Sequence, residues 1–162
     1  MSQEIVAQPR ADLTVREGTE GTYRHKGLAW LDAAKCLHQN NREGFGAFYY
    51  LVSHACELFT KAFLIWRGVP YDQLKSRELG HDIQRLVEKA QELGLPIEEE
   101  FKPFFEALEN LNQENMQRYP KLGFFTLGQQ GYVEPHNMLS WADIYYKKIY
   151  AIISKEKNAK NK

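Results

Sequence analysis

An apolar segment from Phe45 to Trp66 constrains the fold of this chain more than any other feature. Sixteen of its 22 residues are apolar, which is typical of a helix buried on most sides. Three ionisable residues interrupt it, namely His54, Glu57 and Lys61. At roughly 100° per residue, they fall within about 60° of one another on the helix. Because an unpaired buried charge is costly, each needs a partner, and both a structural and a functional partner stay open.

The apolar girth of this segment also bears on assembly. A helix that is apolar on most sides needs cover on most sides, and a single layer of about five helices would leave part of it exposed. The segment therefore favours a homodimer in which the same helix of a second copy completes the cover.

Helical spacing of apolar residues continues on both sides of this segment. Runs of apolar and polar residues that alternate one by one, as in strands, are missing, and short connections favour antiparallel packing of neighbours. Pro103 lies inside one helical pattern and predicts a kink or a restarted helix there. The sequence predicts an all-α, up-and-down bundle of about five helices, at residues 23–40, 45–66, 80–93, 96–118 and 137–155, with a connector at 71–79 that has room for a helical turn and the longest loop at 119–135.

The chain is expected to hold one folded unit between two polar ends. Residues 1–20 lack helical periodicity and predict a flexible N-terminal arm. Residues 21–155 form the predicted helical domain, and the polar residues 156–162 predict a frayed C-terminal tail. A length of 162 residues with 43% hydrophobic content is suited to one domain with a sizeable core.

Charge and cysteine usage narrow the function classes. Lys and Arg together number 21, as do Asp and Glu, so no overall field draws the chain to nucleic acid or to an anionic membrane. Cys36 and Cys56 lie in predicted helices, which favours small buried hydrophobes in a reducing compartment over a disulfide. Residues 1–21 contain no apolar run of a signal peptide, and the ionisable residues within 45–66 disfavour a membrane span. We expect a cytoplasmic protein with no membrane segment.

Several short motifs occur in an order and spacing that resemble the HEPN domain family. They are the run Ser53-His54-Ala55-Cys56-Glu57-Leu58-Phe59-Thr60-Lys61-Ala62-Phe63-Leu64, then Gly68, then Gly80-His81-Asp82-Ile83, and finally Arg118-Tyr119-Pro120. The resemblance covers residues 23–153. It implies a HEPN-like helical domain, a nucleotide or RNA as ligand, and a small nucleotidyltransferase or antitoxin-like protein as partner.

One part of the family pattern is missing. In nuclease members of the family an arginine is followed, after four to six residues, by a histidine. After Arg118 the corresponding positions hold Gly123, Phe124 and Phe125. General acid–base cleavage of RNA needs a group that moves a proton, and arginine does not do so at neutral pH. The sequence therefore predicts a HEPN-like protein without the nuclease motif.

Candidate residues for binding a ligand or an anion follow from these patterns. Each candidate also has a structural interpretation. His54, Glu57 and Lys61 would form a polar network inside the bundle, His81 and Asp82 a helix start, and Arg118 a cap at a helix end. No catalytic residue is assigned and no cofactor or metal is expected, because no metal-ligand motif is present. The candidates are His54, Glu57, Lys61, His81, Asp82, Arg118 and Tyr119.

Three functions remain open at this point. The first is a non-catalytic module that binds a nucleotide, an RNA or a partner protein. The second is a ribonuclease toxin with a non-standard active site that uses Arg118 together with His54 or His81. The third is a structural subunit without a ligand.

Overall fold

The computed structural model describes residues 19–42, 46–76, 79–113 and 133–160. Within these ranges every regular element is helical, and no strand is present. The all-α fold expected from the sequence is confirmed. The elements are α1 (Glu20–Gln39), α2 (Ala47–Trp66), α3 (Tyr71–Leu74), α4 (Ile83–Glu92), the 3₁₀ turn η2 (Glu99–Phe101), α5 (Lys102–Gln113) and α6 (Pro135–Lys160).

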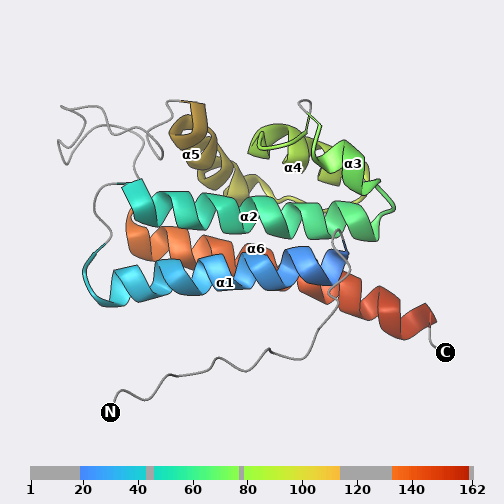
Figure 1. The fold of residues 1–162 in the computed structure, drawn as a ribbon, viewed down its shortest axis with the longest axis horizontal. Coiled ribbons are helices and arrows are strands. Elements are labelled where there is room, and N and C mark those ends of the chain that lie inside the picture. Colours follow the sequence, from blue (N-terminus) through green and yellow to red (C-terminus); the bar gives the residue numbers. More distant parts are fainter. Residues whose placement is uncertain (1–18, 43–45, 77–78, 114–132, 161–162) are drawn as a thin grey trace, which may run out of the picture.

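Helix α2 lies at the centre of the bundle (Figure 1), where it contacts α1, α4, α5 and α6. Helices α1 and α2 run antiparallel, as expected for sequence neighbours joined by a short connection, and α6 runs in the same direction as α2. Helices α4 and α5 lie on the side of α2 away from α1. The bundle is therefore arranged around α2, and α6 packs against both α1 and α2.

The core follows from the apolar surface of α2. Thirteen residues of this helix are buried, and its Phe48, Phe59 and Phe63 side chains are at most 1% exposed. Four helices of the same chain supply this cover, so the reason given for a homodimer, an apolar girth that one chain cannot cover, does not hold. The homodimer itself stays a prediction.

Close contact between α1 and α2 depends on Gly27. A Cβ atom at this position would lie 2.6 Å from Cε1 of Phe59 and 3.3 Å from the carbonyl oxygen of Ala55. Real Cβ atoms do not approach ring carbons so closely. A glycine here lets α1 approach α2 and places the α1 side chains next to the polar residues of α2.

Several helix ends differ from the expected positions; α4, for example, begins at Ile83 rather than at 80, and α5 at Lys102 rather than at 96. Contacts explain two of the differences. Helix α1 begins at Glu20, inside the expected arm, because the Thr19 side chain accepts a hydrogen bond of 3.2 Å from the Thr22 amide. Helix α6 continues to Lys160 and includes most of the expected tail. Its end is held by Glu156, which accepts hydrogen bonds from the Trp66 indole at 2.7 Å and from Arg67.

Other local expectations can be compared directly. Helix α5 starts at Lys102 directly after η2, so Pro103 stands in its first turn, where a missing amide hydrogen is tolerated. The connector after α2 contains the four-residue helix α3.

The two cysteines differ in burial, and both are free thiols. Cys56 is buried as expected, and burial raises the pKa of its thiol, but Cys36 is exposed. Among the described helices, none has the length and apolarity that crossing a bilayer requires.

Candidate functional site

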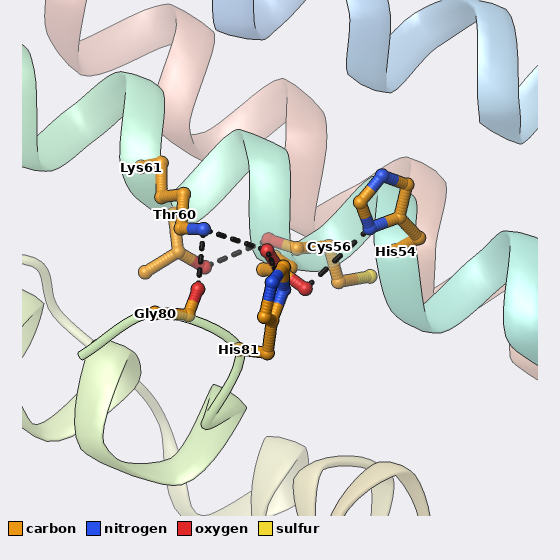
Figure 2. A network of polar contacts seen from close by, with 7 residues as sticks. His54, Cys56, Thr60, Lys61, Gly80 and His81 are labelled. Atoms are coloured by element: carbon orange, nitrogen blue, oxygen red, sulfur yellow. Dashed lines mark hydrogen bonds and ion pairs between the residues drawn. The ribbon is translucent and has the colours of Figure 1, made fainter. Parts of the chain in front are cut away.

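The Glu57 carboxylate is the centre of a polar cluster, whose residues His54 and Lys61 on α2 face His81 before α4 (Figure 2). Its Oε1 atom lies 2.7 Å from Nζ of Lys61 and 3.1 Å from Nδ1 of His81. Its Oε2 atom lies 3.4 Å from Nδ1 of His54. The carboxylate therefore joins three of the ionisable candidates, two from its own helix and one from the segment before α4.

The cluster is buried at its centre and open at its edge. The side chains of Glu57 and Lys61 are 9% and 7% exposed, whereas the His54 side chain is 22% exposed and the His81 side chain 68% exposed. Any ligand from solvent would therefore meet the two histidines before it met Glu57 or Lys61.

Lys61 connects the cluster to the turn before α4. Its ammonium donates hydrogen bonds to Glu57 and to the carbonyl oxygen of Gly80. The Gly80 amide in turn donates to the Ser76 carbonyl oxygen at 2.8 Å, and a Cβ atom at Gly80 would lie 2.7 Å from that oxygen. The turn thus requires a glycine at this position, which places His81 directly beside Glu57.

Asp82 serves as the N-cap of α4, one of the two roles considered for it. Its Oδ1 atom accepts a hydrogen bond of 3.0 Å from the Arg85 amide, and its Oδ2 atom lies 3.2 Å from Nε of Arg85. This cap satisfies one of the amides left unpaired at a helix start. His81, the other residue considered for capping, contacts Glu57 instead.

The surroundings of Glu57 determine its ionisation. Burial by itself would raise the pKa of this carboxyl group, but the hydrogen bond from His54 and the positive charge of Lys61 outweigh burial and lower the pKa to about 2. The group is therefore a carboxylate at neutral pH. Since an ionised carboxylate only accepts hydrogen bonds, both histidines must donate to it through Nδ1.

Aromatic side chains that belong to none of the sequence motifs border the cluster. The His54 ring lies 4.9 Å from the Trp30 ring at an interplanar angle of 88°, and 5.8 Å from the Tyr50 ring at 6°. Tyr23 and Tyr71 lie 6.3 Å apart. Burial, the charge of Tyr71 and the charge of Glu57 raise the pKa of the Tyr23 phenol.

Part of this aromatic border was visible in the sequence. Tyr50 stands one helical turn before His54, and helical spacing alone puts the two on one face. Trp30 belongs to another helix, α1, and no sequence spacing relates it to His54. Only the packing of α1 on α2 brings these rings together.

The structure thus brings together four of the seven candidates, His54, Glu57, Lys61 and His81, and places Asp82 beside them. Arg118 and Tyr119 lie at 114–132, outside the described residues, so their relation to the cluster stays a prediction. Within the described ranges, no group of three or more His, Cys, Asp or Glu residues is arranged to hold a metal ion.

The comparisons with known proteins add no relative. The chain matches no protein-family model, no curated protein and no solved structure. The resemblance to the HEPN family therefore depends on the sequence motifs alone.

Proposed function

We propose that this chain is a HEPN-like, non-catalytic binding module whose ligand carries phosphate, either a nucleotide or an RNA. The observation that supports this most is the position of His81. Its ring is mostly exposed, and its Nδ1 atom is held 3.1 Å from the buried Glu57 carboxylate. Since Nδ1 donates to Glu57, Nε2 carries a hydrogen only when the ring is protonated, and in that form the oriented, exposed imidazolium can donate a hydrogen bond to a phosphate oxygen.

The start of α4 adds to the attraction for an anion. A helix N-terminus carries a partial positive charge, and its first amides point outward from the helix. Asp82 already occupies the Arg85 amide, so the helix end alone is a weak anion site. The proposal therefore depends on His81 acting together with this helix end.

The cluster also supports a binding role in another way. Lys61 and Glu57 are buried and paired with each other, so neither is directed at solvent where a substrate would bind. Their pairing holds the turn before α4 in place. A rigid turn that presents one histidine suits recognition, whereas acid–base catalysis would need a second group that moves a proton.

One observation favours the second candidate, a ribonuclease with a non-standard site. A carboxylate that accepts from Nδ1 of a histidine fixes the tautomer of the ring and leaves Nε2 as a base when the ring is neutral, as in many hydrolytic enzymes. Glu57 and His81 have this relationship. A nuclease also needs a second acid or base placed across the scissile bond, and no described residue is assigned to that role.

Binding is tested by titrating fluorescently labelled RNA and a labelled nucleotide at fixed salt into the wild type and two variants. His81→Ala removes both the contact with Glu57 and the outer edge of the ring. His81→Asn keeps a donor near the Nδ1 position for Glu57 but removes the outer ring nitrogen. We expect both variants to bind about tenfold more weakly, a loss of about 1.4 kcal/mol.

The outcome is decisive in both directions. If His81→Asn binds like the wild type, His81 does not contact the ligand. If the wild type binds neither probe, the phosphate-binding proposal is wrong. Incubating the same RNA with the wild type and reading its length on a gel tests the nuclease alternative, for which cleavage lost in His81→Asn would be the supporting result.

We also propose a homodimer, a protein partner and a cytoplasmic location. A homodimer is supported by two large apolar side chains exposed on α6, Ile144 at 48% and Tyr150 at 43%. A nucleotidyltransferase or antitoxin-like partner and a cytoplasmic location are supported by the family resemblance and by the sequence composition. Light scattering of the purified protein measures whether it is a homodimer. A mass equal to that of one chain at micromolar concentration would contradict the homodimer.

A further inference from the structure

We infer that the RNA ligand is bound as a single strand, with one unpaired base stacked on an aromatic surface formed by Trp30, Tyr50 and His54. This inference rests on the proposed function and extends it to the form of the ligand. It uses side chains that the phosphate-binding proposal does not need.

The three rings form one contiguous group. The Trp30 ring meets the His54 ring at 4.9 Å and the Tyr50 ring at 6.1 Å, in both cases nearly edge to face. The Tyr50 and His54 rings are nearly parallel, with an interplanar angle of 6°. Two parallel rings buttressed by the edge of a third leave little freedom for any of them, so a base that stacks there meets a rigid surface.

These rings are partly open to solvent, unlike the fully buried aromatic side chains of the core. Trp30, Tyr50 and His54 are all of intermediate exposure, whereas Phe59 and Phe63 on the same helix α2 are at most 1% exposed. Trp30 packs against the core with part of its surface, and partly exposed aromatic rings are typical of surfaces on which bases stack.

The aromatic surface is continuous with the proposed phosphate site. Tyr50, His54, Glu57 and Lys61 follow one another at intervals of three or four residues, so they form one stripe along α2. His54 contacts Oε2 of Glu57 and His81 contacts Oε1 of the same group. If a phosphate of the RNA lies at His81, a neighbouring base can therefore reach the aromatic surface, which lies on the opposite side of the Glu57 carboxylate.

A single strand fits this arrangement better than a duplex does. Bases in a duplex are stacked on each other and hide their faces, whereas an unpaired base can stack on a protein ring. Proteins that bind a duplex through its backbone use an extended cationic surface. The chain has no net charge, so its overall charge does not favour such binding. Stacking supplies affinity that the charge does not.

The test compares three probes at fixed salt, namely a short oligouridine, an abasic ribose-phosphate oligomer of the same length, and a duplex of that length. We expect the wild type to bind the oligouridine about tenfold more tightly than the other two, since stacking of one base on an aromatic side chain strengthens binding by about that factor or more. Trp30→Ala and Tyr50→Leu should each reduce this preference several-fold. Trp30→Phe, which keeps a ring, and Tyr150→Ala, an exposed tyrosine on α6, should retain it.

Tryptophan fluorescence gives a second measurement that does not depend on the stability of the alanine variant. Oligouridine should quench the emission of Trp30 in the wild type. Trp30→Phe still emits through Trp66 and Trp141, but it should lose the quenching because the tryptophan that contacts the base is gone. Thermal melting of each variant shows that it is folded when it is titrated.

The outcomes separate this inference from the proposed function. If the wild type binds the oligouridine and the abasic oligomer equally, and His81→Asn weakens both, phosphate binding stands and base stacking is wrong. A preference that survives in Trp30→Ala and Tyr50→Leu also overturns the stacking surface. If no probe binds to the wild type, the proposed function and this inference fail together.

Discussion

Lys61 and Glu57 lie one turn apart on α2, and the Lys61 ammonium donates both to the Glu57 carboxylate, at 2.7 Å, and to the carbonyl oxygen of Gly80. The pair is thus more than a contact within one helix. Because Gly80 precedes α4, the lysine fixes a turn that is distant in sequence. The stability of the bundle and the position of His81 depend on the same two side chains.

Removing the carboxylate should destabilise the fold. Glu57→Ala leaves Lys61 buried without its counter-charge, and we expect the free energy of unfolding to fall by about 1–3 kcal/mol. Urea denaturation measures the change. Glu88→Ala is the matched control, since Glu88 is exposed on α4 and its carboxylate accepts a hydrogen bond from the Gln84 side chain one turn earlier. A midpoint unchanged by Glu57→Ala would mean that the carboxylate contributes nothing to the fold.

The low pKa of Glu57 predicts a loss of stability in acid. The pKa is lowered from 4.5 to about 2 in the folded chain, so the folded state favours the ionised form. Its contribution is therefore fully present above about pH 4.5 and is lost as the pH falls towards 2. It amounts to about 3 kcal/mol at most.

Comparison with Glu57→Gln isolates this contribution, because the pKa values of Asp143 and Glu156 are also lowered. The difference in unfolding free energy between wild type and Glu57→Gln should shrink as the pH falls from 5 to 3. A difference that stays constant over this range would contradict the assignment of the acid-labile stability to Glu57.

Gly27→Ala should weaken the packing of α1 on α2. The added Cβ atom would lie 2.6 Å from the Phe59 ring, so the ring or the helix must shift, and overpacking of this kind costs about 1–3 kcal/mol. Gly21→Ala is the control, because its nearest neighbour is Oγ1 of Thr19 at 3.9 Å. The control should leave the thermal midpoint unchanged or raise it, as alanine favours a helix. Equal midpoints for the two variants would refute the close approach at Gly27.

A buried hydrogen bond links α2 to α6. The Tyr145 hydroxyl lies 2.8 Å from Oγ1 of Thr60, which also donates to the carbonyl oxygen of Cys56. Tyr145→Phe should lower the free energy of unfolding by about 1 kcal/mol, because it removes one buried hydrogen bond. Tyr150→Phe, at an exposed position of α6, should change it by less than about 0.5 kcal/mol. Chemical denaturation of both variants compares them directly.

The all-α fold and the central helix could be predicted because they depend on local information. Apolar spacing identified α2, and a glycine followed by proline placed its end near Trp66. The end of α6 could not be placed in this way. A polar segment frays by its own composition, and only the contact of Glu156 with Trp66 and Arg67 explains why the helix continues.

In the candidate site, too, some contacts follow from spacing along the sequence and others only from tertiary packing. The sequence by itself determined that His54, Glu57 and Lys61 share one face of a helix, because helical periodicity depends only on spacing along the chain. Their partners come from other elements: the carbonyl oxygen of Gly80, the ring of His81 and the ring of Trp30. Only the tertiary structure decided these contacts, since they form when α1 and the turn before α4 pack against α2, and no spacing in the sequence encodes that packing.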